Sequence, residues 1–302
     1  MLIAGAAVLL AFVASAGAAT IAKKNSTGNL NSKQSWIGNK MPNSTDIALR
    51  DSTVTGALAN SLGGNLTWLG IRITNPGGPI TINAGSTLTL GSSGIDMSSA
   101  TANFNLNCAV ALAAAQTWSV NSGRTLTAAG VISGSSSLTK SGAGTLTPAG
   151  TNTFTGGVTV NGGTLSTSSA AALGSGTSSL TLNPTGIFQT TATFSTSRSL
   201  ILGGTGGAAS GGTIDVAAGT THTRTGVISG SGSLTKTGSG TLTLSGTNTF
   251  TGDTYINGGT LSVSGGQSLG PQPSAGSSLY AIHMANGTTF QSTAGFSAGY
   301  RQ

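Results

Sequence analysis

The side chains that could do acid–base chemistry are few in this sequence and stand far apart. All five acidic residues are aspartate, and glutamate is absent from the 302 residues. The five are Asp46, Asp51, Asp96, Asp215 and Asp253. Hydrolysis of a glycosidic bond on the usual plan needs two carboxyl groups roughly 5–10 Å apart, whereas Asp215 and Asp253 are each isolated among Gly, Ser and Thr. We therefore expect no catalytic residue and no enzyme activity.

Neither histidine has a metal-ligand partner nearby in the sequence. His222 lies in Thr-His-Thr-Arg and His283 in Ala-Ile-His-Met, and no Asp, Glu, His or Cys stands at ligand spacing from either. A metal site needs three or four converging ligands. We therefore expect no metal, and we place both histidines on the polar surface or at the edge of a turn.

The lone cysteine and the glycine runs also argue against a cofactor. Cys108 has no second cysteine for a disulfide, so we expect a buried, unreactive thiol. The run of glycines from Gly203 to Gly207 is not followed by Lys-Ser or Lys-Thr. It therefore indicates a turn and not a phosphate-binding loop, and no cofactor is predicted.

The basic residues are numerous but scattered. The chain has 12 Lys and Arg and a net charge of +7, yet only Lys23 and Lys24 are adjacent. Binding to nucleic acid requires a cluster or stripe of basic residues interleaved with aromatic residues. We expect a solvated surface for these charges and no nucleic-acid partner.

A long internal repeat organises the chain. Residues 226–264 read GVISGSGSLTKTGSGTLTLSGTNTFTGDTYINGGTLSVS, and residues 130–168, which lie 96 positions earlier, match them at 29 of 39 positions. Asp253 stands where the first copy has Gly157, so the repeat does not require a carboxylate there. Such self-similarity fixes the class of architecture before any single motif does.

Each copy is a series of short strand patterns ended by Gly or Asn. Aliphatic residues alternate with Thr or Ser at period two, which puts hydroxyls on one face and apolar groups on the other. In the second copy these patterns are 233–235, 241–244, 254–256 and 260–263. Strands this short bury little apolar area alone, so we expect them to coil into stacked turns of an all-β solenoid.

The run GSLTKTGSGTLTLSGTNTFTGDTYINGGTL, residues 232–261, resembles the autotransporter-associated β-strand repeat. This repeat, also called the passenger-associated transport repeat, occurs in large secreted or surface proteins of bacteria. The resemblance implies a right-handed parallel β-helix outside the cytoplasm, with a role in export, stacking and display. It does not imply an active site.

The sequence divides into three predicted segments. Residues 1–22 carry no charge and have an apolar stretch at 6–13 before small-x-small sites, which predicts a secretory signal peptide; a retained apolar helix is the alternative. Residues 23–51 are predicted to form a leader or N-terminal cap, with Trp36 in the cap or exposed as a contact anchor. Residues 52–302 are predicted to form the solenoid, with the chain ending inside a repeat unit at Gln302 as a truncated one would.

Between the cap and the first repeat copy, further strand patterns recur. They cover residues 66–73, 80–82, 87–90, 104–106, 117–120 and 125–127. Residues 109–115 are rich in Ala and Leu, and a short helix competes with a strand there. After the second copy, residues 287–296 echo residues 186–194, displaced by 102 positions at Phe290 and Phe188.

These observations favour a non-enzymatic structural or adhesive protein that is secreted or held on the bacterial surface. Its expected partners are further copies, neighbouring surface proteins, or host or matrix glycans. One alternative is a self-assembling extracellular filament subunit. Another is a glycan-binding module, which needs exposed aromatic platforms, whereas the Trp and Tyr residues are few and dispersed. These are Trp36, Trp68, Trp118, Tyr255, Tyr280 and Tyr300.

Overall fold

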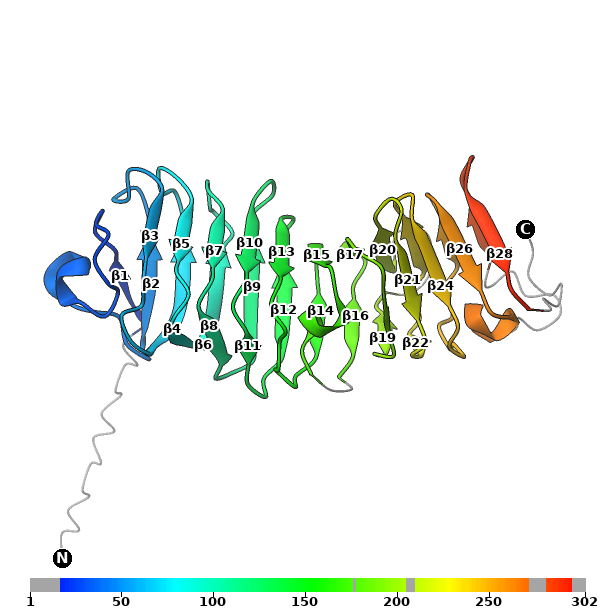
Figure 1. Cartoon of the computed structure of the whole chain (residues 1–302), viewed down its shortest axis with the longest axis horizontal. Coiled ribbons are helices and arrows are strands. Elements are labelled where there is room, and N and C mark those ends of the chain that lie inside the picture. The colour runs from blue at the N-terminus through cyan, green and yellow to red at the C-terminus, as the bar shows by residue number, and fades with distance from the viewer. Residues whose placement is uncertain (1–16, 176–177, 205–209, 272–280, 295–302) are drawn as a thin grey trace, which may run out of the picture.

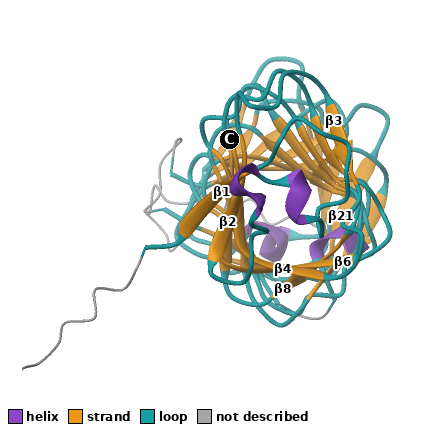
Figure 2. Ribbon diagram, turned by 90° about the vertical axis from the view of Figure 1, so that its left-hand side faces the viewer, coloured by secondary structure: helices purple, strands orange, loops and turns teal. Residues whose placement is uncertain are grey.

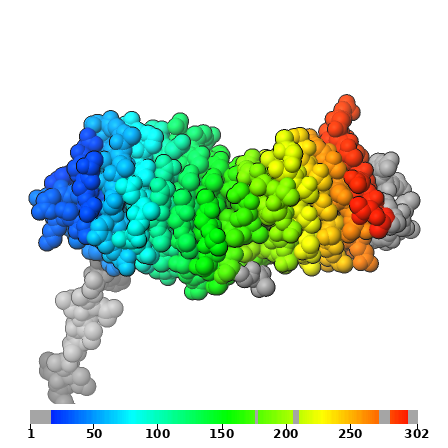
Figure 3. Space-filling view, in the orientation of Figure 1, coloured from blue at the N-terminus to red at the C-terminus, as the bar shows by residue number. Residues whose placement is uncertain are grey.

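The chain forms a rod in which short parallel β-strands are stacked in successive turns of a solenoid. The computed structural model describes residues 17–175, 178–204, 210–271 and 281–294, and these build a β-solenoid of about ten turns with its first and last turns at opposite ends (Figure 1). The space-filling view shows one continuous body between those ends (Figure 3). The predicted all-β, parallel solenoid is confirmed, while the right-handed coil that the resemblance implies stays a prediction.

The strands of the described residues gather in three parallel sheets, here called sheets 1, 2 and 3. Sheet 1 contains β1 (Ala19–Ala22), β2 (Asp46–Arg50), β4 (Leu66–Ile73), β6 (Thr87–Met97), β8 (Ala109–Leu112), β9 (Gln116–Val120), β11 (Ile132–Ser133), β12 (Leu138–Ser141), β14 (Val158–Val160), β16 (Leu180–Leu182), β19 (Leu200–Leu202) and β22 (Ile228–Ser229). Sheet 2 contains β3 (Leu58–Asn60), β5 (Ile80–Ile82), β7 (Phe104–Leu106), β10 (Thr125–Ala128), β13 (Thr145–Pro148), β15 (Gly163–Thr167), β17 (Gly186–Thr190), β20 (Gly212–Val216), β23 (Leu234–Thr237), β25 (Thr254–Ile256) and β27 (Ile282–Met284). Sheet 3 contains β18 (Phe194–Thr196), β21 (Thr221–Arg224), β24 (Thr241–Leu244), β26 (Thr260–Val263) and β28 (Thr289–Ser292).

Each turn has three sides. From β16 to β24 the chain passes through sheets 1, 2 and 3 in strict rotation, so every third strand pairs with the one before it in the same sheet. The end view shows the strands arranged around a common axis (Figure 2). Where a side lacks a regular strand, a short 3₁₀ helix takes its place, as at η3 (Ala170–Leu173) and η4 (Gly266–Leu269).

Alternation of side chains explains why these segments form strands. In β24 the aliphatic residues Leu242 and Leu244 point inward and are fully buried, while Thr241 and Thr243, which alternate with them, face out. Parallel pairing with β26 sets Leu242 against Leu261 and Leu244 against Val263. Each buried aliphatic side chain contributes roughly 1.5–3 kcal/mol, and the stacked rows form one core along the axis.

Most sequence-predicted strands are confirmed within a residue or two of their bounds. The segment 109–115, where a helix competes, forms strand β8 instead. Val110 and Leu112 point inward there, and Val110 pairs with Leu88 on one side and Ile132 on the other. Ladder pairing and burial on both sides outweigh the helix propensity of alanine. The echo after the second copy is also confirmed, because Phe188 pairs with Leu165 and Phe290 with Leu261.

The ladder begins earlier than the start near residue 52 that the strand spacing predicts. Ala19–Ala22 form β1, which pairs in parallel with β2, so residues predicted as apolar segment and cap already belong to sheet 1. Residues 1–16 of that apolar segment lie outside the described residues. Within the residues that the structure describes, no helix is long and apolar enough to span a bilayer.

Residues between β1 and β2 cover the first turn. The 3₁₀ helices η1 (Lys33–Ser35) and η2 (Ile37–Asn39) flank Trp36, which is fully buried, so its exposed-anchor alternative is wrong. Trp36 meets Trp68 edge to face at 5.7 Å, lies 4.9 Å from the Arg50 guanidinium, and donates from Nε1 to the Leu30 carbonyl. In the end view the short helices lie over this end of the solenoid (Figure 2), and the buried Trp36 covers the apolar end of the core.

The two copies of the repeat lie on different sides of the rod. β12 of the first copy lies in sheet 1, whereas its counterpart β23 lies in sheet 2; β13 and its counterpart β24 lie in sheets 2 and 3. In sheet 2, four pairing steps lead from β13 through β15, β17 and β20 to β23. The 96 residues between copies thus make four turns plus one further side.

Replacing Trp36 with alanine should open the capped end alone. We expect a loss of about 3–5 kcal/mol in local stability, the usual effect of truncating a buried tryptophan. Hydrogen exchange should quicken in β1 and β2 but not in β24 and β26, because turns of a solenoid couple mainly to their neighbours. Val131→Ala, at a side chain with 42% exposure, serves as control, and faster exchange along the whole rod would contradict the nearest-neighbour picture.

Candidate functional site: the repeat clamps and the outer faces

A buried lysine holds two successive turns together in each repeat copy. Lys140 Nζ donates to the carbonyl oxygens of Ser141, Gly142 and Gly162 at 2.7, 2.7 and 3.0 Å. Lys236 Nζ donates to the equivalent carbonyls of Thr237, Gly238 and Gly258 at 2.6, 2.8 and 3.1 Å. An ammonium group has three N–H donors, so all of them are used, and one of the three acceptors belongs to the next turn.

The corner beside each lysine requires glycine. Gly142 and Gly238 both adopt φ near +72°, a conformation that residues with a Cβ rarely take. A Cβ on Gly142 would lie 2.3 Å from the Val120 carbonyl oxygen, and one on Gly238 would lie 2.2 Å from that of Val216. The sharp corner brings its carbonyls close together, and the lysine satisfies them.

A buried asparagine links three successive turns in each copy. Ile132 N donates to Asn152 Oδ1 at 2.7 Å, and Asn152 Nδ2 donates to the Ala172 carbonyl at 2.7 Å. Asn248 repeats this arrangement with Ile228 N at 2.7 Å and the Ser268 carbonyl at 2.5 Å. Asn152 and Asn248 themselves lie outside any strand, and their amide groups add to the backbone hydrogen bonds that their segments make with the neighbouring turns.

The expectation that the basic residues form a solvated surface is wrong for many of them. Six of the 11 Lys and Arg residues that the structure describes are buried, because alternation turns them inward. They are Lys23, Arg50, Lys140, Arg198, Arg224 and Lys236. Burial lowers the pKa of Lys140 and of Lys236 to about 8. The remaining surface charge is correspondingly weaker.

His222 is also misplaced by the sequence analysis. It lies fully buried on β21 and not on the surface, packed edge to face against Phe188 and Phe194 with ring centroids 5.6 and 4.6 Å away. Burial and the charge of Arg224 lower the pKa of His222 to about 3. Cys108 is buried as predicted, and burial raises the pKa of its thiol to about 12.

Turn stacking brings Asp253 and His283 together although 30 positions separate them in sequence. His283 Nε2 lies 3.2 Å from Asp253 Oδ2, and the His283 ring stacks on Tyr255 at 4.4 Å and 9°. Asp253 also accepts from Tyr255 Oη at 3.3 Å and from Ala281 N at 2.9 Å. Sequence spacing missed this cluster, which lies on the outer side of sheet 2. Nowhere in the described residues do three His, Cys, Asp or Glu side chains gather as metal ligands would.

Of the aromatic residues weighed as glycan platforms, the tryptophans are all buried. Trp36, Trp68 and Trp118 are 0% exposed, and Tyr280 and Tyr300 lie outside the described residues. Tyr255 remains, in the stack with His283.

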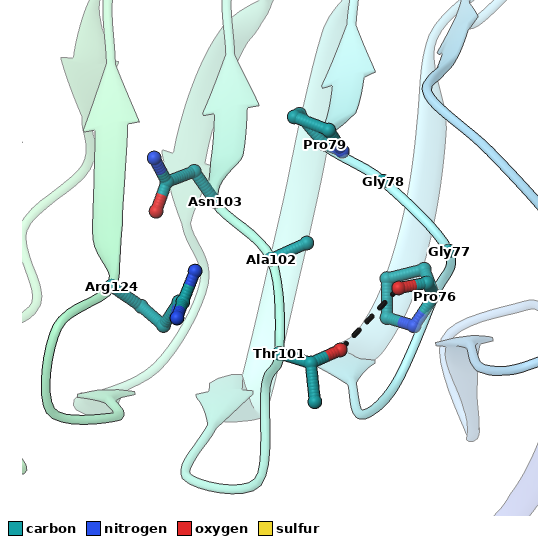
Figure 4. Close-up of a pocket in the computed structure, with 8 residues that line it drawn as sticks. All are labelled: Pro76, Gly77, Gly78, Pro79, Thr101, Ala102, Asn103 and Arg124. Atoms are coloured by element: carbon teal, nitrogen blue, oxygen red, sulfur yellow. Dashed lines mark hydrogen bonds between the residues drawn. The ribbon is translucent and has the colours of Figure 1, made fainter.

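Shallow hollows lie at the corners between turns. Figure 4 shows the one lined by Pro76, Thr101, Asn103 and Arg124, with the Thr101 hydroxyl donating to the Pro76 carbonyl at 3.3 Å. Its volume is about 190 Å³, and two others lined by described residues measure about 250 and 260 Å³. Small-molecule sites usually measure roughly 300–1,000 Å³.

Rows of hydroxyl groups line the outer faces of the sheets. On sheet 1 the pairing places Thr117, Thr139, Thr159 and Thr181 in one row across four strands. Sheet 3 carries a second row, Thr221, Thr241, Thr260 and Thr289. Neighbouring members stand one strand spacing apart, about 4.8 Å, so each face presents a regular neutral polar surface.

The fold and these contacts define a β-solenoid whose turns are locked by repeat-specific clamps. The family model of the passenger-associated-transport-repeat matches residues 138–166 and 234–263, segments that contain both lysines and both asparagines. The chain therefore carries two passenger-associated transport repeats, as the resemblance predicts. Neither the curated proteins nor the solved structures gave a match. The repeats and the solenoid fit a passenger-like domain of an autotransporter, and the repeat suggests export to the cell surface.

Replacing the clamp lysines with methionine should weaken the turns that they join. Lys236→Met keeps most of the side-chain volume but leaves three carbonyls without their charged donor, so we expect a loss of about 2–4 kcal/mol in the free energy of unfolding. Lys140→Met should cost a similar amount, and the double variant should show the sum because the sites do not touch. Urea unfolding measures both; Lys33→Met outside the clamps is the control, and equal stability of all four variants would rule out a clamp.

The buried lysines should also make stability depend on pH. An unfolded lysine keeps its proton up to a pKa of 10.5, whereas Lys140 and Lys236 release theirs near 8 in the folded chain. The unfolded state binds more protons between these values, so the free energy of unfolding should rise with pH across about 8 to 10.5. Thermal or urea unfolding across that interval tests this, and the double methionine variant should show a flatter profile than wild type.

Proposed function

We propose that this protein is a non-enzymatic structural and adhesive rod, exported through a signal peptide and displayed outside the cell or on the bacterial surface. The observation that carries the proposal is the uninterrupted stacking of clamped turns under regular rows of outward threonines. Ten turns at the strand spacing give a core about 50 Å long, enough to separate an outer contact point from an attachment point. The rods' partners would be further copies, neighbouring surface proteins or extracellular glycans.

Two features support the absence of a catalytic or nucleic-acid-binding role. Three hollows lined by described residues, of about 190, 250 and 260 Å³, are smaller than usual substrate pockets. Six of the 11 described basic residues are buried, which keeps their side chains away from the surface where phosphate binding would need them.

Adhesion is tested by removing hydroxyls without changing side-chain shape. Beads coated with the full chain should be retained on a mucin-coated surface under flow. Changing the sheet 1 row Thr117, Thr139, Thr159 and Thr181 to valine should lower retention, while circular dichroism stays unchanged. The same change at Thr221, Thr241, Thr260 and Thr289 shows whether sheet 3 contributes. Retention no greater than for uncoated beads would overturn the adhesive role, and regular polymers in negative-stain images at low protein concentration would favour a filament subunit instead.

Glycan binding is a second candidate, favoured by the cluster of Asp253, Tyr255 and His283. An aromatic stack beside a carboxylate can offer a sugar both an apolar face and a hydrogen-bond acceptor. A glycan array probed with wild type and with Tyr255→Ala tests it. Signals that persist in the variant would place any binding elsewhere, and a silent wild type would remove this candidate.

A further inference from the structure

Two arginines lie inside the solenoid without an acidic partner. Arg198 and Arg224 are 7% and 1% exposed. Arg198 donates to the carbonyls of Ser178 and Gly174, and Arg224 Nη2 donates to the Arg198 carbonyl at 2.7 Å. Among the described aspartates, Asp46, Asp51 and Asp96 belong to the first turns, and Asp215 and Asp253 lie on the outer side of sheet 2. Removing a charge from water without compensation costs several kcal/mol.

Nitrogen atoms on two neighbouring inward side chains have no hydrogen-bond partner. They are Nε and Nη1 of Arg224 and both ring nitrogens of His222, all four buried, although the His222 ring lies within reach of the Phe194 backbone. The two residues are two positions apart on β21, so they point to the same side of the strand. Their neighbours in sheet 3 supply no charge: Phe194 and Leu242 flank His222, and Thr196 and Leu244 flank Arg224.

These buried groups together require a partner that accepts hydrogen bonds and carries negative charge. The free groups of Arg224 are donors only. Burial lowers the pKa of His222 to about 3, so its ring is neutral and has one N–H, for which the Phe194 backbone competes. A water molecule could accept one of these N–H groups but could not neutralise the charge. A small anion would do both.

We propose that a monovalent anion of the halide class binds inside the solenoid against Arg224 Nε and Nη1, beside the His222 ring. Among the side chains that flank His222 and Arg224 on adjacent strands, only Thr196 carries a donor group, which is too few for the extra oxygens of phosphate or sulfate. The site would therefore select a compact, weakly hydrated ion. It would stabilise the turns that lie between the two repeat copies.

Bromide is the probe, and thermal unfolding of the full chain is the readout. Sodium bromide and sodium gluconate are compared at equal ionic strength, because gluconate is too bulky for the core. We expect the midpoint to rise saturably with bromide. In Arg224→Met the apparent dissociation constant should rise at least about tenfold, a change of about 1.4 kcal/mol. His222→Phe should weaken binding less.

Arg50→Met is the matched control. Arg50 is equally buried and also has a free Nε, but its guanidinium lies over the Trp36 ring; this variant should keep the bromide effect. Equal midpoints in the two salts, or an unchanged bromide effect in Arg224→Met, would overturn the proposal. Because Arg224→Met could fail to fold, crystals of the wild type soaked in bromide give a second test. An anomalous peak beside Arg224 Nε supports the site, whereas peaks confined to the surface refute it.

Discussion

The satisfaction of backbone groups at the corners is the constraint on which the rest of this solenoid depends. Along the sheets, N–H and C=O groups pair from turn to turn, but at a sharp corner several carbonyls point into one small space. Lys140 and Lys236 resolve this by placing one ammonium group against three carbonyls. Without such a donor these two corners would bury unpaired acceptors, which would weaken the stacking of the turns that they join.

The strands and their order of stacking follow from the sequence because period-two alternation is a local signal. Thr241-Leu242-Thr243-Leu244 defines a strand and its buried face without any knowledge of neighbours. The same rule holds for Lys236, which follows Leu234 at period two and is therefore inward. Its charge alone suggests a surface position. The signal for a buried position is that both copies of the repeat have lysine at this inward-facing place, Lys140 and Lys236. Asn152 and Asn248 could have been found in the same way.

Other features could not be predicted, because they arise between turns. His222 looks polar and is flanked by threonines, yet the register of β21 sends it inward against Phe188 and Phe194. Asp253 and His283 meet only because the intervening residues complete one turn of a particular length. The early start of the ladder at β1 was hidden by a segment that is apolar enough to suggest a signal peptide or a helix. In each case the number of residues in a turn, and not the type of residue, determines which side chains come into contact.

The offset of the two copies by four turns and one side has a consequence for recognition. If a whole number of turns separated the copies, equivalent side chains would lie on the same side of the rod in a line parallel to its axis. A flat partner could then contact both copies from one direction. Here the second copy is rotated by a third of a revolution about the solenoid axis relative to the first. A partner that recognises this motif would therefore bind the two copies from different directions around the rod axis. A single flat, rigid ligand could not contact both copies, whereas two separate ligands could bind without a steric clash.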